Sequence, residues 1–139
     1  MTPPEGSALI DTSLWIEALR RLGAPAARRA VVQVVEPGMA LVNGLIRAEL
    51  LKGAKDEPDF RRLELLLEAT TSLPFKVSTW ARASRLGFDL RRAGVSVPTV
   101  DLAIAAAALE AGVPVLHRDA HFELIADHVA LSQRFVGDR

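Results

Sequence analysis

Four acidic side chains stand at the ends of apolar segments or at the edge of an apolar helix face, where a carboxylate is costly. They are Asp11, Glu49, Asp101 and Asp119. Carboxylates brought within a few ångströms of one another repel, so some must take up a proton unless they share a cation. Mg²⁺ and Mn²⁺ prefer oxygen ligands, and such ions can activate water against a phosphorus atom. If the fold brings the four together, the set predicts metal-dependent hydrolysis of phosphodiester bonds.

Asp101 gives the clearest signal because it opens a helix, predicted at residues 99–111, that is apolar on every side apart from Glu110 near its end. A helix that is apolar all round is buried, and a buried carboxylate is costly unless it is paired or binds metal. The alternative is that Asp101 only offsets the dipole of its own helix. Because Thr99 is available as a cap, we favour a functional role.

The other three acids each have a structural alternative. Asp11 and Asp119 follow apolar runs at 8–10 and 113–116, so Asp11 could simply cap the next helix and Asp119 could be a solvated turn residue. Glu49 lies three or four residues from apolar neighbours on a predicted helix, where a salt bridge with Lys52 is the alternative. The functional interpretation therefore depends on the set and on where the fold places it.

Short apolar segments alternate with helical ones along the chain. This pattern predicts one domain, residues 1–139, with a three-layer α/β/α fold and a mostly parallel central sheet covered by helices on both faces. Ligands bind beyond the carboxyl ends of such strands, where Asp11 and Asp119 stand. The expected strands are 8–10, 39–42, 73–77, 113–116 and 129–131, and the expected helices are 14–23, 26–35, 45–52, 59–69, 78–93, 99–111 and 121–127.

Composition narrows the function further. The chain has no cysteine, which excludes disulfides, zinc–thiolate sites and cysteine nucleophiles. Seventeen basic and 17 acidic residues cancel, which counts against broad neutralisation of duplex nucleic acid but not against local contact with RNA. There is no signal-peptide pattern in residues 1–7, no apolar run long enough to span a membrane and no glycine-rich phosphate loop. We expect a cytoplasmic protein.

Four sequence pieces resemble the PIN-domain family and, within it, the toxin ribonucleases of VapBC-type toxin–antitoxin pairs. Their order and spacing fit over essentially the whole chain. The resemblance implies an acidic pocket at the carboxyl rim of a parallel sheet, which holds Mg²⁺ or possibly Mn²⁺ and cuts RNA. Asp11 and Asp101 would be the most direct ligands, with Glu49 and Asp119 binding directly or through water. The pieces are LIDTS at 9–13, AELLKG at 48–53, DLAIAA at 101–106 and LHRDAHF at 116–122.

The resemblance also implies partners and two details of the site. The partners would be a second copy of the chain, giving a homodimer, and a small antitoxin encoded alongside that inserts a segment and blocks the pocket. Ser13 matches a small hydroxyl residue that supports the first acid, or it caps the helix. His117 departs from the family, which more often has Thr, Ser or Asn at this position, and this bears on metal preference and rate.

Several alternatives remain open. His117 and His121 are four residues apart and flank Asp119, a spacing that could share zinc on a helix, although this segment has the pattern of a turn and no third ligand is obvious. A receiver-type phospho-acceptor would also place acids at strand ends, but the strand at 39–42 supplies no acceptor aspartate. A PIN-like domain that only binds RNA or a partner is the remaining rival to a nuclease.

Overall fold

A computed structural model describes residues 2–139; Met1, the first residue of the predicted domain, lies outside the described residues. Five parallel strands form one sheet in the order β3-β2-β1-β4-β5. Strand β1 is central, and both its neighbours reach it through long crossovers that contain helices. The strands are β1 (Ala8–Ile10), β2 (Ala40–Val42), β3 (Thr71–Ser72), β4 (Val115–His117) and β5 (Gln133–Phe135).

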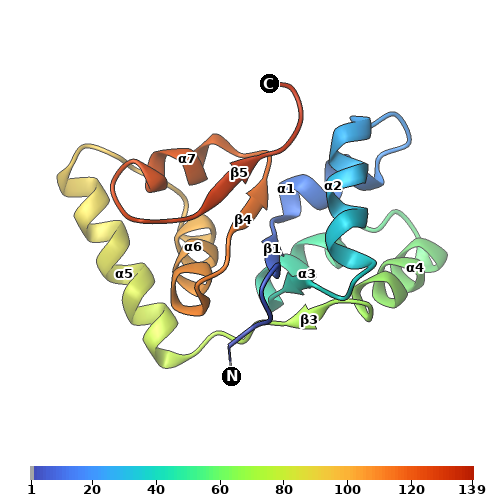
Figure 1. Ribbon diagram of the computed structural model, residues 1–139, viewed down its shortest axis with the longest axis horizontal. Helices are drawn as coiled ribbons and strands as arrows, with labels where there is room; N and C mark the ends of the chain where they lie inside the picture. The colour runs from blue at the N-terminus through green and yellow to red at the C-terminus, as the bar shows by residue number, and fades with distance from the viewer. Residues whose placement is uncertain (1) are drawn as a thin grey trace.

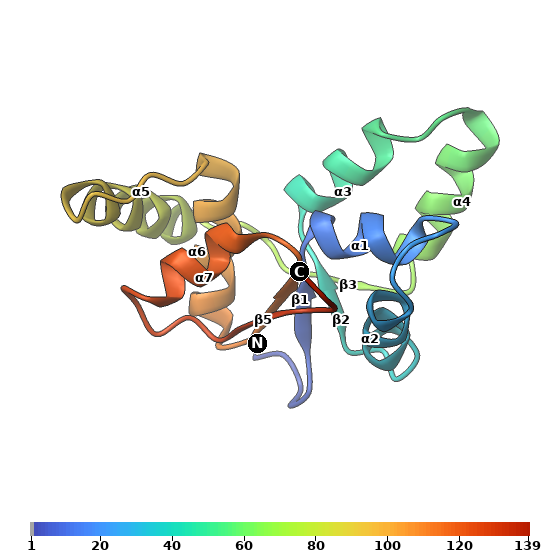
Figure 2. The same ribbon diagram turned by 90° about the horizontal axis from the view of Figure 1, so that it is seen from above.

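Helices cover the sheet on both sides. Figures 1 and 2 show α1 to α4 gathered on one side of the strands and α5 to α7 on the other. Every residue of β1, β2 and β4 is buried, as expected for parallel strands covered on both faces. The predicted fold class is therefore confirmed. The helices are α1 (Thr12–Leu19), α2 (Pro25–Val35), α3 (Gly44–Lys52), α4 (Glu57–Leu67), α5 (Val77–Arg92), α6 (Thr99–Ala111) and α7 (Ala120–Ala126).

Both edge strands lie away from the predicted residues. Strand β3 is at 71–72 rather than 73–77: Leu73 makes the final bond, from its N–H to the Val42 carbonyl at 2.7 Å, and Pro74 has no N–H with which to continue. Strand β5 is at 133–135 rather than 129–131, because the Leu131 N–H turns back to the Val129 carbonyl and the Leu131 side chain is buried in the core. The apolar run at 129–131 is therefore not a strand, and the prediction for it is wrong.

Helix α1 ends at Leu19, earlier than the predicted end near residue 23. Arg20 is extended, and the Glu17 carboxylate accepts a hydrogen bond from the Ala24 N–H at 3.0 Å. This side-chain contact holds the chain in a tight connection to α2. Across the part of the chain that the structure describes, no helix combines the length and the apolar character needed to cross a membrane.

Helix α6 is the buried helix that the sequence predicts. Eight consecutive residues, from Asp101 to Ala108, are buried, and most are alanine, which lets neighbouring elements approach closely. Helix α5 packs closely against α6 at Gly87, where an added Cβ would lie 2.8 Å from Leu102 Cδ1. The helix ends at Gly112, whose φ of +68° is a left-handed conformation that side chains disfavour.

Replacing Gly87 with valine tests the packing of α5 on α6. The branched side chain must displace Leu102, which we expect to lower the free energy of unfolding by about 1–3 kcal/mol. The matched control is Gly44→Ala, because an added Cβ there meets nothing within 4 Å and alanine favours a helix. Urea unfolding followed by circular dichroism measures both. Wild-type stability in Gly87→Val would contradict the close approach.

Candidate active site

The carboxyl ends of β1 and β4 are tied together by hydrogen bonds. The Asp11 N–H donates to the Leu116 carbonyl at 2.9 Å. The Ser13 hydroxyl donates to Asp11 Oδ2 at 2.6 Å and accepts the Arg118 N–H at 2.9 Å, joining residues 105 positions apart. This pairing sets the start of α1 beside the loop that carries Asp119.

Asp11 caps the next helix, as its structural alternative supposed, and its carboxylate also lies within electrostatic reach of the other acids. It caps α1, because Oδ2 accepts the Ser13 N–H at 3.0 Å, whereas Thr12 and Ser13 lie inside the helix. Burial is the main cause that raises the pKa of the Asp11 carboxyl, and the charges of Asp119 and Glu49 raise it further. The two hydrogen bonds from Ser13 oppose that rise. The capping role therefore orients the carboxylate rather than removing it from the site.

Asp101 lies in the first turn of α6 and is only 8% exposed. Thr99, which the sequence offered as an available cap, is instead the first helical residue, and Pro98 takes the cap position without a side-chain bond. Burial, followed by the charges of Asp119 and Asp11, raises the pKa of Asp101 to about 6, and His121 opposes the rise. This is the behaviour of a buried acid close to others of the same charge.

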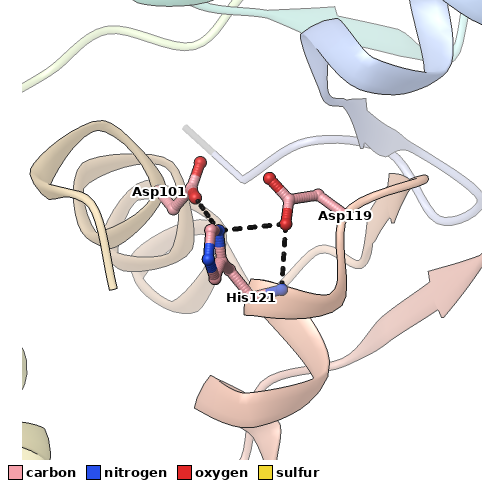
Figure 3. A group of neighbouring side chains, drawn as sticks. All are labelled: Asp101, Asp119 and His121. Carbon is pink, nitrogen blue, oxygen red and sulfur yellow. Dashed lines mark hydrogen bonds and ion pairs between the residues drawn. The ribbon is translucent and has the colours of Figure 1, made fainter. Parts of the chain in front are cut away.

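Asp119 caps α7 and meets Asp101 through a histidine. Its Oδ1 accepts the His121 N–H at 2.9 Å. The His121 ring atom Nδ1 lies 2.9 Å from Asp101 Oδ2 and 3.0 Å from Asp119 Oδ1, as Figure 3 shows. Asp119 is thus a capping residue that faces the other acids, not only a solvated turn residue.

Glu49 approaches the group from α3. Its Oε1 accepts a hydrogen bond from the Thr12 hydroxyl at 2.8 Å, and within residues 2–139 it forms no ion pair with Lys52. Its charge is among those that raise the pKa of Asp11. The structure therefore places all four acids around the carboxyl ends of β1 and β4, each within electrostatic reach of another.

His117 does not join His121, which leaves the zinc alternative without support. Its ring is fully buried, Nδ1 accepts the Asp119 N–H at 3.1 Å, and Nε2 lies 2.6 Å from Gln133 Oε1. Because Nδ1 is an acceptor, Nε2 carries the proton and donates to Gln133. Burial lowers the pKa of His117, so the ring stays neutral and holds the loop on which Asp119 stands.

Sequence reasoning missed two contacts. Thr12 has no assigned role in the LIDTS piece, yet its hydroxyl donates to Glu49 from 37 positions away. His121 was considered only with His117, yet it bridges Asp101 and Asp119. The only available signal was that Thr12 adjoins Asp11 and that His121 follows Asp119 by two positions, which does not reveal a long-range partner.

The four acids offer oxygen ligands of the kind that a hard divalent cation prefers, and within residues 2–139 only Asp101 and Asp119, together with His121, have ligand atoms within 4.8 Å of one another. One oxygen of each already accepts a hydrogen bond or faces His121, which fixes its orientation. No hydrogen bond within residues 2–139 uses the second oxygen, namely Asp11 Oδ1, Glu49 Oε2, Asp101 Oδ1 or Asp119 Oδ2. Oriented carboxylates with an uncommitted oxygen fit Mg²⁺ or Mn²⁺.

Comparison with known proteins identifies the family. The sequence pattern of the PIN domain matches residues 8–128. The chain belongs to the PIN-domain family. It is 37% identical over 121 residues to ribonuclease VapC51 of Mycobacterium tuberculosis, covering 85% of this chain and 84% of that protein. It is also 37% identical to ribonuclease VapC11 of the same species over 123 residues, covering 85% of this chain and 90% of that one. The resemblance seen in the four motifs is confirmed.

Solved structures agree on the PIN fold. VapBC2 from Rickettsia felis bound to a promoter DNA fragment superposes with a TM-score of 0.78 at 16% identity, covering 94% of this chain and 98% of that one. FitAcB from Neisseria gonorrhoeae gives 0.76 at 20% identity, covering 91% and 95%. At these identities the likeness establishes the PIN fold.

The raised pKa of Asp101 predicts how stability changes with pH in the metal-free protein. Its pKa is about 6 folded against 3.8 for a free carboxyl, so the folded chain binds more protons between these values. The stabilisation is complete below about pH 4 and is lost as the pH rises through 6. At pH 7.5, Asp101→Asn should raise the free energy of unfolding by about 1–3 kcal/mol.

Urea unfolding at pH 4 and pH 7.5 with a chelator present measures the effect. The advantage of Asp101→Asn should vanish at the lower pH. The matched control, Asp127→Asn, changes an exposed acid at the end of α7 and should match wild type at both. If Asp101→Asn were no more stable than wild type at pH 7.5, the charged Asp101 carboxylate would not be destabilising the folded protein.

Proposed function

We propose that this PIN domain is a metal-dependent endoribonuclease. The observation that supports the proposal is the gathering of acidic charge at one end of the sheet. Asp101 and Asp119 both contact His121, the charges of Asp119 and Asp11 raise the pKa of Asp101, and the charge of Glu49 raises that of Asp11. Buried acids that lie close together raise each other's pKa, and acids perturbed in this way cluster at functional sites. The two relatives named as ribonucleases support RNA as the substrate.

The residues of the chain would act mainly by orientation. Ser13 fixes Asp11, Thr12 fixes Glu49, and His121 spans Asp101 and Asp119. Mg²⁺ or Mn²⁺ held by these acids would supply a Lewis acid for the phosphate and lower the pKa of water. Hydrolysis forms a bond from water oxygen to phosphorus and breaks the bond to one ribose oxygen, leaving a phosphate end and a hydroxyl end.

A PIN domain that only binds RNA or a partner is the remaining alternative. Such a protein would have no need for oriented carboxylates that each keep an uncommitted oxygen. A receiver-type domain has lost its support, because the family match covers residues 8–128. We therefore favour catalysis.

Asp101→Asn should abolish most of the cleavage of structured RNA. Losing one anionic ligand removes transition-state stabilisation of several kcal/mol, so the rate should fall by at least about 100-fold. Gel analysis of end-labelled RNA measures the rate with Mg²⁺, with Mn²⁺ and with a chelator. Asp127→Asn should cleave at the wild-type rate. Cleavage that persists in chelator, or in Asp101→Asn, would refute a metal-dependent site.

We further propose the toxin role, with a small antitoxin encoded alongside as partner. The neighbouring structures from Rickettsia felis and from nontypeable Haemophilus influenzae, the latter VapBC-1, support a complex of this kind. A mostly apolar groove formed by α1, α2 and α4 is a surface on which such a partner could bind, because the apolar face of a partner helix would pack into it. The homodimer stays a prediction. The groove is lined by Trp15, Ala18, Leu19, Arg28, Val31, Val32, Val35, Glu36 and Leu66.

Val32→Glu tests the groove, because Val32 is 41% exposed and a charge there would oppose apolar packing. Co-expression with the adjacent antitoxin gene, followed by co-purification and light scattering, should show a complex weakened by about 10-fold or more. Val77→Glu is the matched control, since Val77 is 88% exposed on the far helix layer. Equal binding by both variants would place the antitoxin elsewhere.

A further inference from the structure

His121 is held against two of the four acids by its own backbone. It follows Asp119 by two positions in the first turn of α7, and its N–H donates to Asp119 Oδ1 at 2.9 Å. The ring then turns Nδ1 toward Asp101 Oδ2 at 2.9 Å and Asp119 Oδ1 at 3.0 Å, as Figure 3 shows. The ring nitrogen and both carboxylates therefore point to one place.

One ordinary hydrogen bond does not account for both contacts of Nδ1. A ring nitrogen carries at most one hydrogen, so Nδ1 can make a strong bond with only one of the two oxygens. The second oxygen then lies beside the same nitrogen with no hydrogen between the two atoms. A cation between the ring and the two carboxylates would satisfy all three groups at once, provided that Nδ1 is unprotonated.

The spacing also suits ligands of one ion. Adjacent ligands of an octahedral ion with bonds of about 2.0–2.1 Å lie about 2.8–3.0 Å apart. The two contacts of Nδ1 have this length, and one ligand atom each from Asp101, Asp119 and His121 lie within 4.8 Å of one another. Within residues 2–139 this trio is the one group of acids and histidines compact enough to hold an ion.

We propose that His121 contributes Nδ1 as a nitrogen ligand to the divalent ion of this site, which makes the site favour a transition-metal ion such as Mn²⁺ over Mg²⁺. The proposal rests on the proposed function, since it assigns a further ligand to the same site. Imidazole binds transition-metal ions well, whereas Mg²⁺ is suited by carboxylate, carbonyl and water oxygens. One nitrogen ligand therefore changes the choice of ion more than it changes the total charge.

The other two histidines do not compete for this role. Both ring nitrogens of His117 are engaged, one by the Asp119 N–H and one by Gln133. His128 is exposed, and its Nδ1 lies 3.1 Å from the Leu124 carbonyl. His128→Gln is therefore a matched control that removes an imidazole without touching the site.

Calorimetric titration of the chelator-stripped full chain with Mn²⁺ and, separately, with Mg²⁺ tests the preference. We expect His121→Phe to lose at least about 10-fold in Mn²⁺ affinity while its Mg²⁺ affinity changes by less than about 3-fold. The ratio of the two affinities isolates the nitrogen ligand, because a change in local charge or stability acts on both ions alike. His128→Gln should keep the wild-type ratio. An unchanged ratio in His121→Phe would overturn the proposal.

Pulsed electron paramagnetic resonance of the Mn²⁺-loaded protein gives a second readout that does not depend on activity. The wild type should show coupling to a directly bound nitrogen that changes when histidine is labelled with ¹⁵N, and His121→Phe should lose it. Mn²⁺ that binds in wild type, is lost in Asp101→Asn and shows no nitrogen coupling would refute the histidine ligand alone. Failure of wild type to bind either ion would instead refute the proposed function and the ligand together.

Discussion

Repulsion between carboxylates at one end of a parallel sheet is the constraint on which the rest of the site depends. Burial and neighbouring charge raise the pKa of Asp101 to about 6, and they act in the same direction on Asp11. The fold offsets part of this cost with hydrogen bonds: Ser13 donates twice to Asp11, and Thr12 donates to Glu49. These donors orient the carboxylates without neutralising them. Such a site is poised for a cation, because a cation removes the remaining repulsion.

The topology explains why these residues meet. With β1 central and β4 directly beside it, the carboxyl ends of the first and fourth strands become neighbours. Parallel strands carry their next segments to the same edge, which sets the starts of α1 and α7, with their capping acids Asp11 and Asp119, at one rim of the sheet. An aspartate that follows a parallel strand can therefore cap the next helix and also belong to the acidic group at the rim, as Asp11 and Asp119 do.

The loop after β4 shows how a departure from the family pattern is accommodated. His117 is buried between the rings of Phe122 and Phe135, at centroid distances of 5.0 and 5.8 Å, and accepts the Asp119 N–H. Arg118 points away from the acids, donating to the Val136 and Asp138 carbonyls near the carboxyl terminus. The histidine thus supports Asp119 through the backbone, so its effect on the site is one of position.

The sequence by itself determined the helices, the three buried strands and the four acids, because these depend on apolar periodicity and on polar residues at segment ends. Asp101 could be singled out since a carboxylate in an apolar helix is locally anomalous. Only the tertiary structure decided the edge strands, where Pro74 and the turn at Leu131 outweighed local apolar character, and the partners Thr12–Glu49 and His121–Asp101. Such contacts join residues 37 and 20 positions apart, and a sequence does not state which distant side chains a sheet brings within hydrogen-bonding distance.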